Sequence, residues 1–315
     1  MTILVTGSIA YDTIMVFPDR FRHHLLADQL HILNVCFLTP EMRREYGGTA
    51  GNITYNLKLL GDEPLAMATV GEDAGPYLER LRGLGIGTQL LKVIPGQFTA
   101  QAFITTDLDD NQITAFHPGA MNHAHENHIT RALGAKLAII APDGKEGMLQ
   151  HARECAEHGI PMMFDPGQGL PMFSPQELRG FLQGAHYVAV NDYEGKLLEE
   201  RTGKRLEELA GGVKALVWTM GAKGSIIIAG GKRYEVPCVE AEAVVDPTGC
   251  GDAYRAGLLY GIAHGWDWPS TGKLAALMGA IKVARRGAQN HAATRDEIEA
   301  RYSRAFGYSP WRMST

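Results

Sequence analysis

Short apolar runs alternate along the chain with longer segments in which apolar residues recur at helical spacing. The expected strands are residues 2–8, 65–71, 135–142, 160–167, 186–191, 215–221 and 224–230. The expected helices are residues 53–61, 73–85, 144–159, 174–184, 192–203, 253–265, 273–287 and 294–307. Strands that alternate with helices of about a dozen residues form a mostly parallel sheet covered on both faces. The pattern therefore predicts an α/β fold, whose ligands gather at the carboxyl ends of the strands.

Two segments interrupt this alternation. Residues 13–45 hold strand-like pieces, among them 30–38, around a charged turn. Residues 97–117 are typical of a β-hairpin, with the turn-forming sequence DLDDN at 107–111 between two alternating runs. We expect both segments to form a small β-lid on a single domain spanning 1–315, with a plain structural extension as the alternative.

The composition and charge of the chain exclude several classes of protein. The 315 residues are 45% hydrophobic and 21% charged, which is enough for a large core. The net charge of −5 and the lack of a long basic run argue against nucleic acid as a partner. The four cysteines form no CxxC pair, and no apolar stretch approaches the roughly 18–20 residues of a membrane span. We expect a soluble cytoplasmic protein with reduced thiols, without a signal peptide or a membrane partner.

The most informative stretch is VVDPTGCGDAYRAG at 244–257. Its β-branched start suggests a strand that gives way to a buried helix. The first amides of a helix lack internal partners and carry the positive end of its dipole. Because glycines at 249 and 251 let a ligand approach those amides, the turn could cradle an anion. The alternative is a tight turn capped by Asp252.

This stretch resembles the motif of the ribokinase-like (PfkB) family of sugar and nucleoside kinases, with Cys250 where alanine is common. A second match is GGTAGN at 47–52, a glycine pair followed by Asn52, although no clear strand precedes it. The resemblance covers essentially the whole chain. It implies a three-layer α/β/α fold with a small β-lid, and it makes Asp252 the catalytic base. The amides of Gly249, Cys250 and Gly251 are then expected to hold the charge on the transferred phosphoryl group.

Two further matches concern the phosphate donor and its metal. Asn191 and Glu194 resemble the family's Asn-x-x-Glu, which implies Mg²⁺ bound by Glu194 through water; an ordinary helix start capped by Asn191 fits equally well. TMGAKG at 219–224 resembles the nucleotide loop, with Thr219, Gly221 and Gly224 near ATP; a β-turn is the commoner meaning.

The last third of the chain supplies two weaker matches. Residues 284–290, ARRGAQN, resemble the adenine-side segment, and Gln289 is the expected nucleotide contact. Asp246 and Thr248 resemble positions that bind a monovalent cation in some relatives, which would add K⁺ as a cofactor.

The acceptor is predicted from Asp12 and the lid. Asp12 lies where the family holds sugar hydroxyls, and a carboxylate can accept from both hydroxyls of a ribose diol; a turn aspartate is the alternative. The resemblance also places Gly48 and Asn52 at the substrate. Phe103 and Phe116 head a set of apolar lid residues on which a purine could stack, although lid core is the commoner role for each residue taken singly. The others are Met15, Phe17, Phe37 and Met121.

Together these features look most like the adenosine and broader nucleoside kinases of the family. The expected reaction transfers the γ-phosphate of ATP to the 5′-hydroxyl of a nucleoside. A sugar kinase acting on ribose or fructose is the main alternative. A non-catalytic nucleoside-binding regulator is disfavoured because Asp252 and both glycines of its motif are present. A homodimer formed through the lid is a further expectation.

Overall fold

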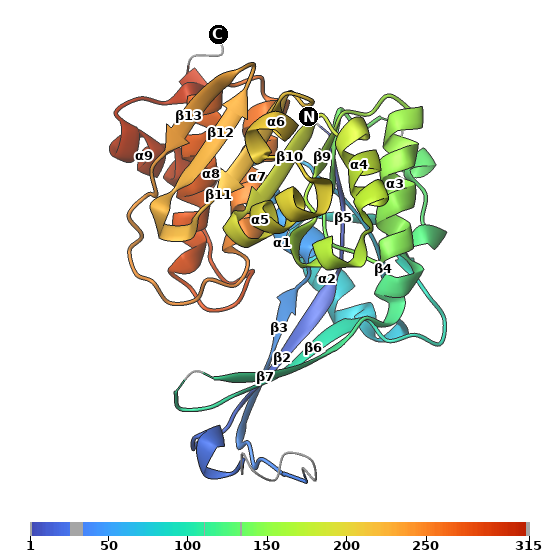
Figure 1. The fold of residues 1–315 in the computed structure, drawn as a ribbon. Coiled ribbons are helices and arrows are strands. Elements are labelled where there is room, and N and C mark those ends of the chain that lie inside the picture. Colours follow the sequence, from blue (N-terminus) through green and yellow to red (C-terminus); the bar gives the residue numbers. More distant parts are fainter. Residues whose placement is uncertain (1, 26–33, 110, 133, 313–315) are drawn as a thin grey trace.

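A nine-stranded sheet forms the centre of the molecule (Figure 1). The computed structural model describes residues 2–25, 34–109, 111–132 and 134–312. In spatial order the sheet consists of β13 (Lys232–Val236), β12 (Ser225–Ala229), β11 (Ala215–Thr219), β10 (Tyr187–Asn191), β9 (Met162–Phe164), β8 (Leu137–Ile140), β1 (Ile3–Thr6), β4 (Leu65–Val70) and β5 (Gly87–Val93). All neighbouring pairs are parallel except β11–β12 and β12–β13.

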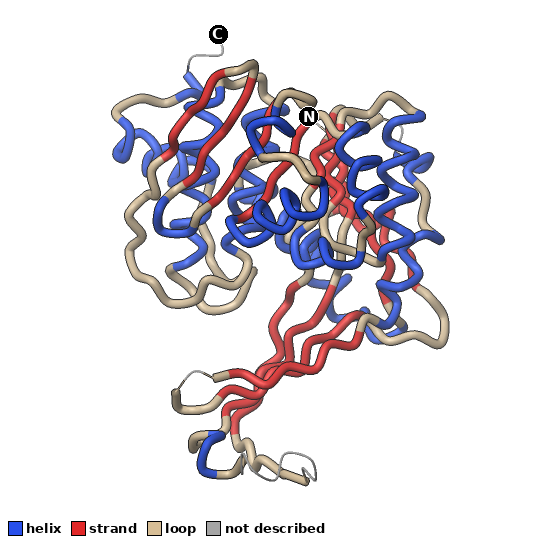
Figure 2. Tube along the Cα trace, viewed as in Figure 1, coloured by secondary structure: helices blue, strands red, loops and turns tan. Residues whose placement is uncertain are grey.

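Helices cover both faces of this sheet, which confirms the three-layer α/β/α architecture (Figure 2). One face carries α1 (Thr49–Leu59), α2 (Gly75–Gly83), α7 (Cys250–Ala263), α8 (Trp268–Val283) and α9 (Arg295–Phe306). The other carries α3 (Lys145–Glu157), α4 (Pro175–Gly184), α5 (Asp192–Thr202) and α6 (Leu206–Ala210). Each side has its own buried apolar cluster, because strands buried on both faces send alternate side chains to opposite layers.

The order of the strands determines where a ligand can bind. The chain first builds β1, β4 and β5 toward one edge, and then returns to β8, on the other side of β1. Connections that leave a strand in opposite directions open a crevice at the carboxyl ends of the central strands. The strand order therefore places the expected ligand position beyond β1 and β8, where the chain enters the glycine-rich segment before α1.

A separate four-stranded sheet projects from the lower side of the main body (Figure 1). Its spatial order is β3 (Glu41–Gly47), β2 (Ala10–Val16), β6 (Ala100–Thr106) and β7 (Gln112–His117). We call this sheet the lid. At its far end the ring of Phe37 packs against Phe17, with centroids 4.8 Å apart, and against Phe21, with centroids 5.0 Å apart. Phe17 and Phe37 therefore form part of the lid core.

Some expected elements are absent or different. Of residues 30–38, the part at 34–38 contains no strand, and 30–33 lie outside the described residues. The run Val244–Val245 was expected to be a strand, but it is exposed loop. The amides of Val245 and Asp246 both donate to the carbonyl of Val283, a bond to a helix end that replaces strand pairing. Within the described residues, no helix is long and apolar enough to cross a membrane.

Candidate active site

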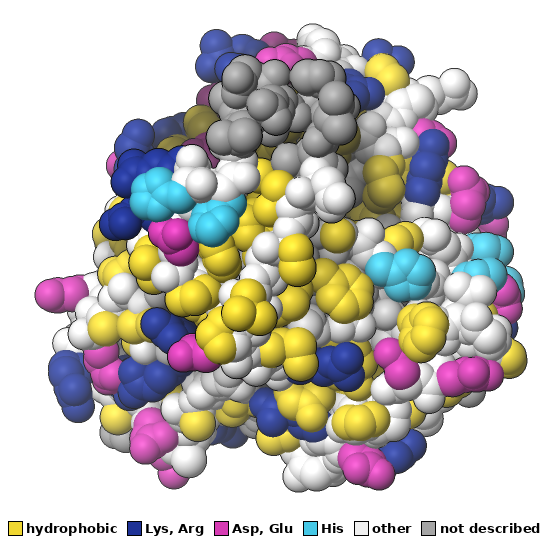
Figure 3. Space-filling model, turned by 90° about the horizontal axis from the view of Figure 1, so that it is seen from below, with side chains coloured by type: hydrophobic (Ala, Val, Ile, Leu, Met, Phe, Trp, Pro, Cys, Tyr) yellow, Lys and Arg dark blue, Asp and Glu magenta, His cyan; other side chains and the backbone are white. Residues whose placement is uncertain are grey.

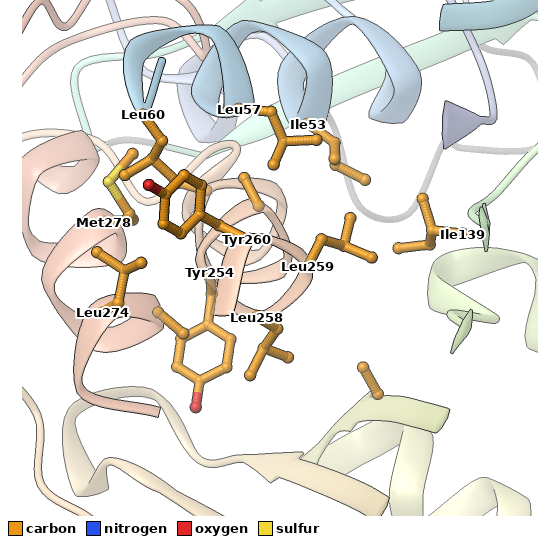
Figure 4. Close-up of a cluster of buried hydrophobic side chains, with 14 of the residues drawn as sticks. Ile53, Leu57, Leu60, Ile139, Tyr254, Leu258, Leu259, Tyr260, Leu274 and Met278 are labelled. Atoms are coloured by element: carbon orange, nitrogen blue, oxygen red, sulfur yellow. The ribbon is translucent and has the colours of Figure 1, made fainter. Parts of the chain in front are cut away.

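Asn52 and Asp252, from the two main motifs, meet through a side-chain hydrogen bond. Asn52 Nδ2 donates to Asp252 Oδ2 at 2.8 Å, although 200 positions separate the two residues. Packing of α1 against α7 fixes this contact. The apolar faces of the two helices supply Ile53 and Leu57 on one side and Leu258 and Leu259 on the other, all fully buried (Figure 4).

The surroundings of Asp252 adjust its acidity. Burial raises the pKa of Asp252 to about 7, and the hydrogen bond from Asn52 acts in the opposite direction. The negative charge of Asp165 raises the pKa further, while Arg255 lowers it. A carboxyl group that titrates near neutrality can accept a proton from a reacting hydroxyl and release it again.

The tip of α7 presents free amides beside this carboxylate. Gly249 precedes the helix with φ of +77°, a left-handed conformation that favours glycine. Among the described residues, the amides of Gly249 and Gly251 have no hydrogen-bond acceptor. The amide of Cys250 donates to the carbonyl of Pro247 at 3.1 Å, so the expected set of three free amides is reduced to two. Burial raises the pKa of the Cys250 thiol to about 11, which keeps it protonated.

A buried chain of polar side chains holds Asn52 in place. Gln289 Nε2 donates to Asn52 Oδ1 at 3.0 Å and to Tyr77 Oη at 2.6 Å, and Tyr77 Oη donates to the carbonyl of Gly47. Because Gln289 is buried and its amide points toward Asn52, its expected role as a nucleotide contact is wrong. It orients the Asn52 amide so that Nδ2 faces Asp252.

The backbone conformation at position 48 and the close approach of Ser8 require a glycine. It has φ of +84°, and a Cβ at this position would lie 2.5 Å from the carbonyl oxygen of Ser8. The glycine pair therefore lets α1 begin directly against the end of β1. The strand β3 ends at Gly47, so the motif does follow a strand, contrary to the expectation.

Asp12 lies at the base of the lid. Burial raises the pKa of Asp12 to about 6, and the charges of Glu45 and Asp246 add to this. Asp12 pairs with Ala102 on β6, and Ala102 pairs with Phe116 on β7, so Asp12 and Phe116 share one face of the lid.

Phe103 lies on the opposite face. It is the neighbour of Ala102 along β6, and successive side chains of a strand point to opposite sides. The two phenylalanines therefore cannot both contact a substrate held by Asp12. The expected contact between Phe103 and the substrate therefore does not fit this register, whereas the expected contact of Phe116 does.

Asn191 and Glu194 form the start of α5. Asn191 Oδ1 accepts from the amide of Glu194 at 2.8 Å, and the Glu194 carboxylate accepts from the amide and the side chain of Asn191. This is a capping box, the structural alternative considered for these residues. Burial and the charge of Asp165 raise the pKa of Glu194, and Arg255 lowers it.

Sequence reasoning missed the charged pair behind this site. Arg255 and Asp165 are both buried, and the guanidinium donates from Nε to Oδ2 at 3.0 Å and from Nη2 to Oδ1 at 3.2 Å. Arg255 Nη2 also lies 3.7 Å from Glu194 Oε2. An arginine inside the apolar helix after Asp252 was the available signal, because a buried charge is almost always paired.

The segment from Thr219 to Gly224 connects the antiparallel strands β11 and β12. The amide of Met220 donates to the carbonyl of Gly224, so the segment is the turn that was the commoner interpretation. Gly224 has φ of +85°, and a Cβ there would lie 2.2 Å from the carbonyl oxygen of Val236. Thr219 pairs with Asn191 across β11 and β10, which places the turn beside the start of α5.

Asp246 shapes the loop that leads to the tip of α7. Its Oδ1 accepts from the amide of Thr248 at 2.9 Å, and its Oδ2 accepts from the amide of Gly287 at 2.8 Å. Its carbonyl oxygen accepts from Lys282 Nζ at 2.7 Å. An ammonium group therefore contacts the position at which a monovalent cation was expected.

Several known proteins are similar to this chain in sequence and fold. The model of the pfkB family carbohydrate kinases matches residues 10–295. A nucleoside kinase of Methanocaldococcus jannaschii is 32% identical over 270 residues, which cover 85% of this chain and 89% of that protein. The structure of Burkholderia thailandensis nucleoside kinase in complex with inosine is 53% identical, with a TM-score of 0.89 and coverage of 98% of this chain and 99% of that one. Its complex with ADP-inosine is 54% identical, with a TM-score of 0.87 and coverage of 98% and 97%.

Proposed function

This chain belongs to the pfkB family of carbohydrate kinases, and we propose that it transfers the γ-phosphate of ATP to the 5′-hydroxyl of a nucleoside. The observation that carries the proposal is the contact between Asn52 and Asp252 beside the free amides of Gly249 and Gly251. The similar nucleoside kinase bound to inosine and to ADP-inosine supports a nucleoside as acceptor and an adenine nucleotide as donor.

In this reaction Asp252 takes the proton of the attacking hydroxyl. A free alkoxide is too basic to form at neutral pH, so a positioned carboxylate gives general-base help of about 10²- to 10⁴-fold. The amides of Gly249 and Gly251, at the positive end of the α7 dipole, hold the negative charge on the transferred phosphoryl group. The oxygen–phosphorus bond to the acceptor forms as the bond from the γ-phosphorus to ADP breaks, and the proton stays on Asp252.

The acceptor is oriented by Asp12 and the lid. The Asp12 carboxylate can accept from both ribose hydroxyls, and Phe116, on the same lid face, offers a flat apolar surface to the base. Gly48 contributes a backbone without a side chain near the sugar. We propose a purine nucleoside, adenosine or inosine, which makes the reaction a step of purine salvage in the cytoplasm, where ATP is available.

Mg²⁺ is proposed as the cation that accompanies the nucleotide. Asp165 and Glu194 are two buried carboxylates that share the single guanidinium of Arg255, so a negative charge is left over at this position. Oxygen ligands and retained water suit Mg²⁺. Both Glu194 carboxylate oxygens already accept hydrogen bonds from Asn191, so Glu194 would bind Mg²⁺ through a water molecule, as expected from the sequence. When bound, the ion would neutralise charge on the phosphates; Asn191, Thr219, Gly221 and Gly224 would lie along the nucleotide.

The proposed function is tested by ATP consumption with a panel of acceptors. We expect adenosine and inosine to consume ATP with formation of the 5′-monophosphate, identified by phosphorus NMR, and ribose and fructose to be inactive. Turnover of ribose or fructose in preference to nucleosides would make the protein a sugar kinase. Binding of nucleosides without any turnover would favour the regulator.

The two lid phenylalanines give a matched test of substrate binding. Phe116→Ala should raise KM for inosine about tenfold, because loss of an aromatic contact costs roughly 1–1.5 kcal/mol. Phe103→Ala removes the same ring from the opposite face and should leave KM within about twofold. Steady-state kinetics of both variants, with the oligomeric state checked by light scattering, measures the difference. Equal effects would refute the face assignment.

The second lid face supports a homodimer as the proposed assembly. Figure 3 views the molecule from the side of the lid and shows apolar side chains gathered between charged ones. Met42, Phe103 and Ile113 are exposed, and the register places them together on the face opposite Asp12. Exposed apolar side chains gathered on one face mark association sites. A mass of one chain by light scattering at micromolar concentration would exclude this dimer.

A further inference from the structure

Lys282 is a fully buried lysine with its amino group between two loops. It lies near the end of α8, and its Nζ donates to the carbonyl oxygen of Asp246 at 2.7 Å and to that of Arg285 at 3.1 Å. The nearest carboxylate oxygen, Asp246 Oδ2, is 4.0 Å away. Lysine is almost never fully buried unless it is paired, so this position requires an explanation.

The two loops that Lys282 joins hold the tip of α7. The first, residues 244–249, leads directly into the free amides. The second, residues 284–288, packs against it, and Gly249 lies so close to Ala288 that an added Cβ would be 2.8 Å from its side chain. The ammonium group therefore fixes the turn on which the anion cradle depends.

We propose that the ammonium group of Lys282 replaces a bound monovalent cation, so that this protein needs no K⁺ at the Asp246 loop. A bound K⁺ and an ammonium group can play the same role here, because each brings a single positive charge to carbonyl oxygens of two loops. The ammonium has three donors and already uses the carbonyl oxygens of Asp246 and Arg285, so K⁺ would lack ligands and be repelled there. Burial lowers the pKa of Lys282, and the Asp246 carboxylate opposes this.

Lys282 is thus a positioning residue for the proposed reaction, and the effect on turnover rests on the proposed function. The effect of cations on the thermal stability of the protein is independent of the proposed function. The experiment measures both in KCl and in tetramethylammonium chloride at equal ionic strength, for the wild-type protein and for Lys282→Ala.

The wild-type protein should show rates within about twofold in the two salts and no difference in Tm, since a filled site has no further affinity for cations. Lys282→Ala should lose about 10- to 100-fold in kcat in tetramethylammonium, as expected when a catalytic loop shifts. K⁺ or methylammonium should restore part of that loss and raise the Tm of the variant, because they enter the vacated space.

Two further variants make the test specific. Lys282→Met fills the space without charge, so it should lose activity and respond to neither cation. Lys273→Ala, on the same helix but with its amino group bonded to Tyr308, should behave like the wild type.

Strong activation of the wild type by K⁺ would overturn the proposal, and so would a Lys282→Ala variant with normal rates and no ion response. If Lys282→Ala does not fold, the proposal is tested by the K⁺ response of the wild-type protein and by the activity of Lys282→Met. If no nucleoside is phosphorylated, the Tm comparison still decides on Lys282.

Discussion

Replacing Asp252 by asparagine should lower kcat by about 10²- to 10⁴-fold, the share that a general base contributes. The amide has nearly the same shape and can still accept a hydrogen bond from Asn52, but it cannot take a proton from the substrate hydroxyl. Nucleoside affinity should therefore change little. Steady-state ATP consumption gives kcat, and titration calorimetry with inosine gives the dissociation constant.

The matched control is Asp296→Asn, the same substitution at an exposed position in the first turn of α9. This variant should retain wild-type kcat. An Asp252→Asn enzyme that keeps more than about a tenth of wild-type turnover would exclude Asp252 as the base.

The second large effect concerns stability. Arg255→Met should lower the free energy of unfolding by about 3–5 kcal/mol, because it leaves the buried carboxylates of Asp165 and Glu194 without their positive partner. The loss should be smaller at pH 5 than at pH 8, since a carboxyl group left alone in the interior escapes the penalty by binding a proton. Urea unfolding at the two pH values measures both effects.

Arg233→Met serves as the control for the loss of an arginine. Arg233 is exposed on β13 and lies 3.5 Å from Glu235, a surface ion pair that contributes less than about 1 kcal/mol. If Arg255→Met were as stable as this control, the cluster of Arg255, Asp165 and Glu194 would not stabilise the fold around the site, contrary to our account.

Much of the main sheet follows from sequence periodicity alone. Strands such as β8 and β10 are short apolar runs buried on both sides, and the helices between them carry recognisable ends. Thr294 and Glu297, for example, form a capping box at the start of α9, and this pair of residue types three positions apart is visible in the sequence. These features are local, so the residues that determine them lie next to one another in the chain.

Two of the strands that were not predicted, β3 and β13, have a different environment. β3 reads EMRREYG and β13 reads KRYEV, and nearly all of their residues are exposed or half-buried. Their stability comes from pairing with β2 and β12 rather than from burial of their own side chains. Hydrophobic patterning cannot detect a strand whose partner supplies the apolar face.

The site shows the same division between local and long-range information. Resemblance indicated Asn52 and Asp252, and the hydrogen bond between them is consistent with the roles assigned. The orientation of Gln289, the use of the Cys250 amide by Pro247 and the opposite faces of Phe103 and Phe116 depend on tertiary packing and register. A motif identifies which residues belong together, but it does not state which way each one points.

The central claim is that the half-buried carboxylate of Asp252 at the tip of α7 takes the substrate proton, and the pH dependence of kcat tests this claim most directly. Saturating nucleoside keeps Asp12, whose pKa is raised to about 6, from dominating the profile. Because burial raises the pKa of Asp252 to about 7 and only the ionised form can accept a proton, kcat should rise with pH and reach half its maximum near pH 7. The residual rate of Asp252→Asn should lack this limb. A wild-type kcat that stays constant from pH 5 to pH 8, or a limb that persists in Asp252→Asn, would contradict the account.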